Sequence, residues 1–373
     1  MKRRAVSWLI MLTLSSGIHC LPAAEEGNNS VALEALGRLQ GVDLEANPAV
    51  KAAVLKFLEK TRGTPDFVQI VRQFKLTAQE PGLLEVAIKN PASEAGVEAL
   101  RIILATGSSA TIQDALRSPD VPRASKTAEA LGNTREKAAV PLLQQVLADP
   151  QRDIAVRKQA TKALAQTHDG AGELLRLAEA EHLADDLKFT AGSELNAALW
   201  PDIKTRAAKI LPPPEGRNAQ PLPPVAELIK MKGDAANGET IFFRDTSLCA
   251  NCHKIRDRGA EVGPNLSEIG SKLGKDALVE AILDPSAGIS MGFETFHIEL
   301  KNGDDLFGLI ASETPEELSV KDSRGVLTRY RKSDVTRREK LTTSLMPSGL
   351  QASMSRQEFI DLLEFLFAQK KTN

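Results

Sequence analysis

A proline-rich segment divides this chain of 373 residues into two parts that cannot share one continuous secondary structure. Residues 211–224 hold six prolines. Each proline fixes its φ angle at about −65° and removes a backbone hydrogen-bond donor. A segment of that composition forms an extended, semi-rigid spacer. We therefore predict a linker over residues 212–229, with a separate folding unit on either side.

The part before the linker, residues 31–211, has the periodicity of amphipathic helices separated by short polar turns. Similar helix ends recur at 104–107, 131–134 and 164–167, with 27 and 33 residues between their first positions. Such a period is typical of helix pairs that stack to bury their apolar faces. The stretch 141–164 looks like a HEAT repeat. We predict HEAT-like helical repeats, with an irregular helical bundle as the alternative.

The part after the linker changes from helical to strand-like periodicity and back. We predict helices over 234–243, 275–283 and 356–369, and four short strands over 296–300, 306–310, 318–321 and 326–330. The predicted fold class is therefore mainly α, with a C-terminal helical domain at 230–373. That domain carries a small antiparallel β insertion at about 291–340.

The N-terminus has the layout of a secretory signal peptide. Lys2, Arg3 and Arg4 precede an apolar run, and small residues follow at 21–24. The run is shorter than the roughly 20 residues that span a bilayer, so the alternative of an uncleaved anchor is less favoured. We expect cleavage of residues 1–24, a periplasmic or secreted protein, and no membrane span after cleavage. A net charge of −2 gives no reason to expect a nucleic-acid partner.

Cleavage would leave two cysteines, Cys249 and Cys252, and His253 follows them directly. Two thiols at this spacing can add to the vinyl groups of a haem, and the adjacent imidazole can ligate its iron. A redox dithiol or half of a zinc site are the alternatives. The dithiol belongs to a βαβ context, and the zinc site needs further ligands. We predict one covalently attached haem c, held by Cys249 and Cys252 and ligated by His253.

The second axial ligand is less constrained by the sequence. A thioether would complete an electron-transfer haem, and the candidates after the linker region begins are Met231, Met291, Met346 and Met354. Met346 lies in an irregular loop in which Pro347 and Gly349 can fix the course of the chain. We therefore favour Met346, with His297 as the main alternative.

Several motifs of the C-terminal part occur together in one known family. They are Gly233–Gly238, the Cys249–His253 segment, Gly263–Leu266, Asp284–Ser286 and Ser344–Pro347. In this combination, residues 230–373 resemble the haem-binding domain of the Pirellula/Verrucomicrobium type, a class I cytochrome c variant of planctomycetes and verrucomicrobia. The resemblance implies that His253 and Met346 are the axial ligands. It also implies that the Pro264 carbonyl accepts a hydrogen bond from the His253 imidazole, and that HEAT-like repeats can precede the domain.

These features favour an electron-transfer protein over an enzyme, because two axial ligands leave no open site on the iron. We expect a protein redox partner that docks on the helical repeats or the haem edge. The alternative is the cytochrome subunit of a larger periplasmic dehydrogenase, or a peroxidase-like haem enzyme. A di-haem peroxidase would need a second Cys-x-x-Cys-His motif, which the sequence lacks.

Overall fold

The computed structural model describes residues 34–39, 41–107, 109–212, 222–244 and 247–371. Its chain separates into two compact units, with the boundary between Phe57 and Leu58. The predicted signal peptide, residues 1–24, lies outside the described residues. The protein is mainly helical with small antiparallel sheets, as predicted. Within the described ranges no helix has both the length and the apolar character needed to cross a membrane.

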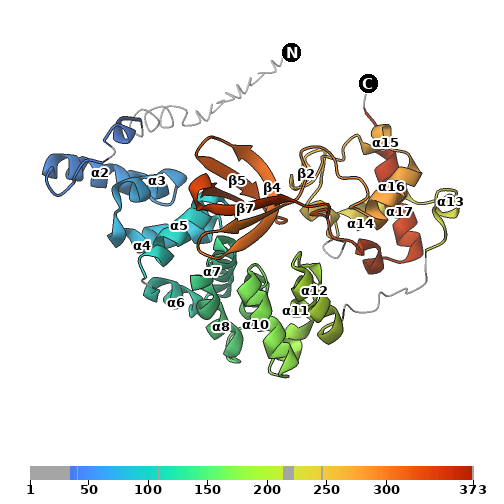
Figure 1. Cartoon of the computed structure of the whole chain (residues 1–373), viewed down its shortest axis with the longest axis horizontal. Coiled ribbons are helices and arrows are strands. Elements are labelled where there is room, and N and C mark those ends of the chain that lie inside the picture. The colour runs from blue at the N-terminus through green and yellow to red at the C-terminus, as the bar shows by residue number, and fades with distance from the viewer. Residues whose placement is uncertain (1–33, 40, 108, 213–221, 245–246, 372–373) are drawn as a thin grey trace, which may run out of the picture. The chain divides into compact units, whose positions relative to one another are not determined.

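Helices account for nearly all of the regular structure before the proline-rich segment (Figure 1). The first unit holds most of α2 (Pro48–Lys60). The second unit continues with α3 (Pro65–Phe74), α4 (Glu80–Lys89), α5 (Glu94–Ala105), α6 (Ala110–Leu116), α7 (Val121–Thr134), α8 (Val140–Ala148), α9 (Ile154–Leu164), α10 (His168–Glu179), α11 (Asp185–Ala197) and α12 (Pro201–Ile210). Side chains cap several N-termini, as where Asp120 accepts a hydrogen bond from the Arg123 amide.

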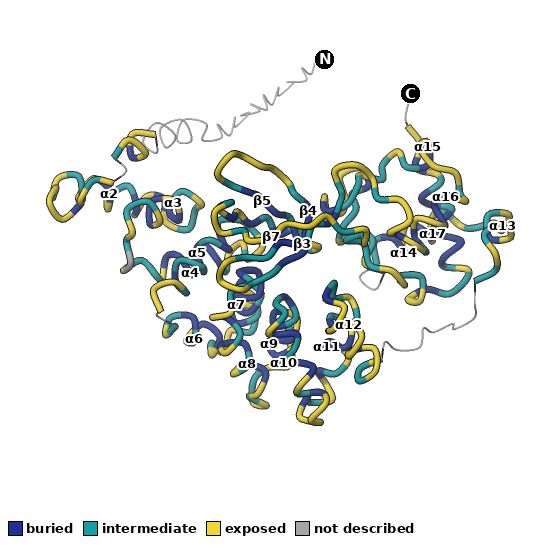
Figure 2. Tube along the Cα trace, in the orientation of Figure 1, coloured by how far each residue is buried: buried dark blue, intermediate teal, exposed yellow. Residues whose placement is uncertain are grey.

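Helices that are close together in the sequence of the second unit pack against one another through their apolar faces. Contacts join α4 to α5, α7 to α9, α8 to α9 and α11 to α12. Leu131 and Leu164, at the recurring helix ends, are both fully buried, and Figure 2 shows buried positions along the facing sides of these helices. The contact between α7 and α9 is so close that a Cβ at Gly132 would lie 2.7 Å from Ala163 Cα.

The C-terminal helices surround α17 (Arg356–Ala368), which contacts α14 (Ala235–Phe242), α15 (Ile269–Lys272) and α16 (Lys275–Leu283). Their core is apolar and includes Phe242, Val279, Phe359 and Leu363.

Part of the predicted linker differs from expectation. Residues 213–221 lie outside the described residues, but α13 (Val225–Leu228) is a short helix, and Leu228 is completely buried in the same core.

The crossing of α14 and α17 brings two backbones into direct contact. A Cβ at Gly238 would lie only 2.0 Å from the Asp361 carbonyl oxygen, so only glycine fits. The Asp361 carboxylate is buried, and it accepts hydrogen bonds from the Asp234 amide at 2.8 Å and from Asn237 Nδ2 at 2.7 Å. Burial by itself would raise the pKa of Asp361, but these hydrogen bonds and one from Gln357 lower it overall.

Between α16 and α17 the chain forms a five-stranded antiparallel sheet in the order β6-β5-β4-β3-β7. The strands are β3 (Phe296–Leu300), β4 (Asp305–Glu313), β5 (Glu317–Lys321), β6 (Leu327–Arg331) and β7 (Val335–Lys340). The prediction of four strands was incomplete because it missed β7. This edge strand pairs with β3 in the register Phe296 to Lys340. Its residues after Val335 are charged or polar and exposed, so the apolar alternation that indicates a strand is absent.

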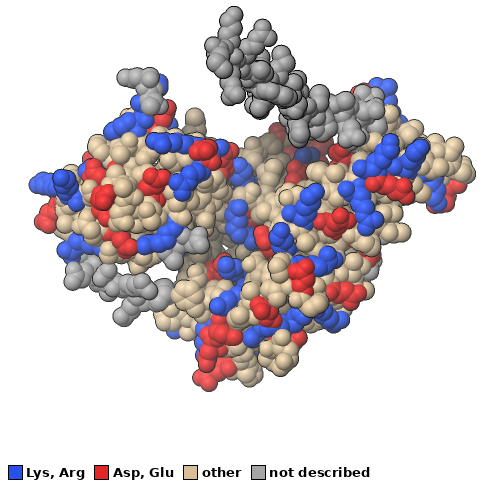
Figure 3. Space-filling view, turned by 180° about the vertical axis from the view of Figure 1, so that it is seen from behind, with Lys and Arg blue, Asp and Glu red and all other residues tan. Residues whose placement is uncertain are grey.

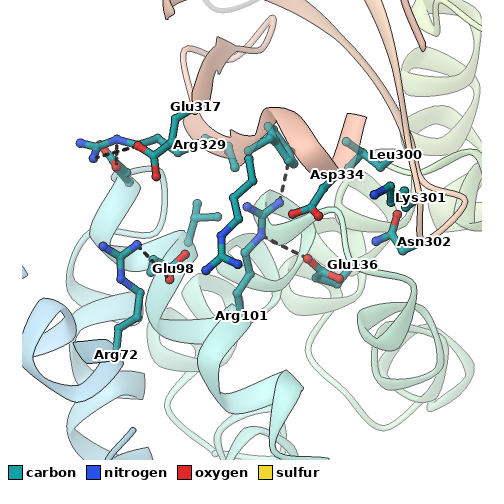
Figure 4. Close-up of a pocket in the computed structure, with 15 residues that line it drawn as sticks. Arg72, Glu98, Arg101, Glu136, Leu300, Lys301, Asn302, Glu317, Arg329 and Asp334 are labelled. Atoms are coloured by element: carbon teal, nitrogen blue, oxygen red, sulfur yellow. Dashed lines mark hydrogen bonds and ion pairs between the residues drawn. The ribbon is translucent and has the colours of Figure 1, made fainter. Parts of the chain in front are cut away.

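The sheet contacts the helical part of the second unit at several points. The Arg101 guanidinium of α5 donates to the Tyr330 hydroxyl at 3.1 Å and lies 5.0 Å from the centre of that ring. Figure 4 shows Arg101 between α5 and the strands, where it also pairs with Glu136 at 3.2 Å. Near the start of α12, Trp200 Nε1 donates to Asp305 Oδ2 at 2.8 Å. The β insertion therefore lies against the helices rather than in solvent.

The close crossing of α14 and α17 predicts a strong effect of one methyl group. Gly238→Ala should lower the free energy of unfolding by about 2–3 kcal/mol, because the helices must separate to admit the new Cβ. Gly172→Ala is the matched control, since Gly172 is also helical but has no atom within 4 Å of its Cβ position. It should be neutral or slightly stabilising. Urea unfolding of both variants tests this, and equal stability would contradict the geometry.

The turn between β3 and β4 predicts a pH-dependent stability. Burial raises the pKa of Asp304 from 3.8 to about 6, and the Glu136 carboxylate adds to the shift against the opposing charge of Lys137. The folded protein therefore binds the Asp304 proton more tightly than the unfolded chain does. The stability that this proton contributes is present at low pH and is lost as pH rises through about 6. The free energy of unfolding of Asp304→Asn minus that of the wild type should therefore increase between about pH 4 and about pH 7. A difference that does not change with pH would contradict the assigned pKa.

Candidate cofactor site around Cys249, Cys252 and His253

The segment from Cys249 to His253 is a single tight turn. Leu248 enters it with a left-handed φ of 64°, and Cys249–Asn251 form a 3₁₀ turn. The Cys249 carbonyl then accepts from the Cys252 amide at 3.2 Å and from the His253 amide at 2.9 Å. These bonds hold the two thiols and the imidazole on one compact loop, which comes shortly after α14 in the sequence.

Both thiols are free and half-buried. Cys249 Sγ lies 3.5 Å from the Ser247 carbonyl oxygen, and Cys252 Sγ lies 3.6 Å from the Ser323 carbonyl oxygen. Burial raises the pKa of each thiol, and for Cys252 the nearby Cys249 and Asp322 raise it further. The loop therefore presents two neutral thiols that are not joined in a disulfide.

The imidazole of His253 has a fixed orientation. Its Nδ1 lies 2.8 Å from the Pro264 carbonyl oxygen, which is the contact that the family resemblance implies. A carbonyl can only accept, so Nδ1 carries the hydrogen and Nε2 retains a lone pair. Burial lowers the pKa of His253, although the bond to Pro264 opposes the shift. The site therefore contains a neutral imidazole with Nε2 available as a ligand.

A return segment, residues 260–264, brings Pro264 to the imidazole. The Ala260 amide donates to the Ala250 carbonyl at 3.0 Å, and the Gly263 amide donates to the Cys252 carbonyl at 2.8 Å. A Cβ at Gly263 would lie 2.6 Å from His253 Cε1. Only glycine lets the backbone pass this close to the ring, so Gly263 belongs to the site although its position relative to the ring could not be read from the sequence.

The candidates for a second axial ligand differ in their surroundings. Met346 is half-buried in irregular structure, and its amide donates to Ser344 Oγ at 3.1 Å. Met354 is buried in the C-terminal core, and Met291 is 93% exposed. The Nε2 atom of His297 lies 2.9 Å from Asp305 Oδ2, and its ring stacks on Phe307. His297 is thus engaged within the sheet, whereas the Met346 thioether makes no hydrogen bond within the described part of the chain.

Sequence reasoning missed one neighbour of the loop, the turn between β5 and β6. Its Ser323 carbonyl contacts Cys252, and Lys321 Nζ donates to the Glu261 carbonyl at 3.0 Å. The turn is 71 residues from Cys252 in the chain, and nothing in its composition indicates contact with the cysteine loop. Groups of three or more His, Cys, Asp or Glu side chains suited to a metal ion do not occur within the described ranges.

Comparisons with known proteins give one family-model match and several relatives of low identity. The family model for cytochrome c matches residues 235–303, so the C-terminal part contains a cytochrome c-like domain. The chain is also 26% identical over 178 residues to deoxyhypusine hydroxylase of Neosartorya fischeri, covering 45% of this chain and 50% of that protein. It is 28% identical over 142 residues to deoxyhypusine hydroxylase of Aspergillus clavatus, covering 38% and 40%. The chain thus spans half or less of the length of these relatives.

The close approach of Gly263 to the imidazole gives a test on the protein without any cofactor. Gly263→Ala should displace the ring and break the Nδ1 bond to Pro264. ¹⁵N NMR of His253 should then show a loss of the single Nδ1–H tautomer. Gly288→Ala is the control, because nothing lies within 4 Å of its Cβ position. An unchanged tautomer in Gly263→Ala would contradict the assigned packing.

Proposed function

We propose that this protein is an exported mono-haem c-type cytochrome that transfers single electrons. The observation that carries the proposal is the neutral His253 imidazole, whose Nδ1 is tied to the Pro264 carbonyl so that Nε2 is left to ligate iron. The cytochrome c family model covers this residue, both cysteines and Pro264. The match and the local geometry therefore support the same assignment.

The residues present fit a covalently attached haem c. The two thiols are unpaired and share one turn with the imidazole, and Cys249 and Ala250 pack against the apolar core of the C-terminal helices. We assign Cys249 and Cys252 as attachment residues, His253 as one axial ligand and Pro264 as the acceptor that orients it. When bound, the haem would supply an iron that alternates between Fe(II) and Fe(III).

Met346 is the proposed second axial ligand. The other candidate ligands are less suitable, because the His297 imidazole is hydrogen-bonded to Asp305 and the Met354 side chain is packed in the core. If His253 and Met346 both ligate the iron, the haem would offer no open position to a substrate. We therefore propose an electron carrier and not an enzyme. The activity named for the deoxyhypusine hydroxylases is not extended to this chain.

The remaining parts have roles consistent with this assignment. We propose that residues 31–211 are HEAT-like repeats, supported by the stacked helix pairs and their close contact at Gly132. Residues 212–229 would link them to the cytochrome domain at 230–373, whose family resemblance is to the planctomycete and verrucomicrobial type.

Export rests on the sequence of residues 1–24 and would place the protein in the periplasm or outside the cell. A protein redox partner would dock on the repeats or at the haem edge.

Spectroscopy of the full chain, made in a host that attaches haem to c-type cytochromes, tests the proposal. The reduced pyridine haemochrome should show one covalent haem per chain, and the native protein should be low-spin. Met346→Ala should remove the thioether-to-iron charge-transfer band and lower the reduction potential, since thioether ligation raises it.

Met291→Ala is the matched control, because this exposed methionine can be truncated without loss of packing. It should keep the charge-transfer band. A wild-type protein that lacks the band, or that is mainly high-spin, would rule out ligation by Met346. A wild-type protein that carries no covalent haem would rule out the proposed function.

A further inference from the structure

The turn between β5 and β6, residues 322–325, is held in one conformation by its own side chain. Asp322 is buried, and its Oδ1 accepts from the Arg324 and Val326 amides at 2.9 Å each. The Gly325 amide also donates to the Asp322 carbonyl at 3.0 Å, and Gly325 has a left-handed φ of 82°. The 322–325 turn is therefore a rigid element whose position is set by what holds Asp322.

The helical part of the chain binds this turn through Arg135. The Arg135 guanidinium contacts Asp322 Oδ2 at 2.9 Å and the Gln166 carbonyl at 3.2 Å. The two side chains of the ion pair are only 12% and 4% exposed. Arg135 follows α7 with a left-handed φ of 56°, which is unusual for a residue with a long side chain. From this position at the end of α7 the guanidinium reaches a carboxylate 187 residues away in the chain.

The opposite side of the same turn contacts the cysteine loop. The Ser323 carbonyl is the hydrogen-bond acceptor for Cys252 Sγ. Lys321, which precedes the turn, donates to the Glu261 carbonyl in the segment that leads to Gly263 and Pro264. A Cβ at Gly325 would lie 3.2 Å from Val262 Cγ2. The turn thus lies between Arg135 and the loop that carries Cys252 and His253.

Other contacts also join the sheet to the helices. Arg329 of β6 pairs with Glu94 of α5 at 2.6 Å, and Figure 4 shows Arg329 beside Glu317 at this side of the sheet. At the other side Trp200 bonds Asp305 and lies edge-on to Phe307. None of these contacts involves Arg135, so they remain available when Arg135 is changed.

We propose that Arg135, a residue of the helical repeats, is a positioning residue for the haem-attachment loop, acting through Asp322 and the Ser323 carbonyl on Cys252. The β insertion is then the element that connects the repeats to the redox site. This inference rests on the proposed function, because it takes Cys252 as an attachment residue. It assigns the repeats a role inside the molecule, in addition to any role in docking a partner.

Thiol labelling of the full chain, produced in a cytoplasm without haem-attachment machinery, tests the proposal without haem. Iodoacetamide labelling of Cys252 is followed by mass spectrometry, with Cys249 as the internal reference. Arg135→Gln should increase the Cys252 rate about fivefold, because coupling between sites is commonly of this size or larger. Asp322→Asn should act in the same direction, and the double variant should not exceed the larger single effect if both act through one contact.

Arg152→Gln is the matched control. Arg152 also lies among the helical repeats and donates to backbone carbonyls, those of Arg117 at 2.9 Å and Ser118 at 3.1 Å, which belong to the helical repeats and not to the sheet. It should lower stability in urea without raising the Cys252 rate. An unchanged Cys252 rate in Arg135→Gln, or an equal increase in Arg152→Gln, would overturn the proposal.

The haem-loaded proteins give a second readout that a purely structural role would not produce. Fe(III) carries one more positive charge than Fe(II), so a cation near the haem raises the reduction potential and an anion near the haem lowers it.

 

Removing the Arg135 cation stabilises Fe(III), so Arg135→Gln should lower the reduction potential. Removing the Asp322 anion destabilises Fe(III), so Asp322→Asn should raise the potential. Shifts of opposite sign support the proposal, and no shift in either variant counts against it. If the wild type takes up no haem, the proposed function fails, while the labelling result still decides whether Arg135 positions the loop.

Discussion

The contact of α14 with α17 at Gly238 is the constraint on which the C-terminal part of the molecule depends. The two backbones meet where a side chain on Gly238 would overlap the Asp361 carbonyl. The buried Asp361 carboxylate then binds the start of α14 through the Asp234 amide and the Asn237 side chain. The cysteine turn comes shortly after α14 in the sequence, so this crossing fixes the helix from which the chain leads to the thiols and the imidazole.

The cysteine loop shows how backbone bonds can orient an imidazole side chain. The return segment is bonded to the turn it faces, and it brings the Pro264 carbonyl to His253 Nδ1. The orientation of the ring and the position of its hydrogen both follow from this one acceptor. Gly263 is part of the same arrangement, since any side chain there would occupy the space of the imidazole.

The β insertion gives the molecule its long-range connections. Its strands contact α5 and the start of α12, and its 322–325 turn lies between Arg135 and Cys252. A sheet of this size, with one exposed edge strand, has a small core of its own, built on residues such as Ile298 and Leu318. Packing against the helices therefore supplies part of the burial that the sheet needs.

The sequence by itself determined the local features of this protein. Helical periodicity located α14, α16 and α17, and alternation located four strands, because both patterns reflect burial of one face of a single element. The spacing of Cys249, Cys252 and His253 indicated their shared chemistry. The strand β7 was missed because its exposed face carries charges in place of an apolar alternation.

Only the tertiary structure decided which distant segments meet. The pairing of Arg135 with Asp322, the contact of Ser323 with Cys252 and the closeness of Gly263 to the His253 ring depend on how separate elements pack. No local pattern encodes these contacts, because a buried ion pair or a backbone approach requires two surfaces to be brought together first. The sequence thus specified the residues of the cysteine turn, and packing decided what surrounds them.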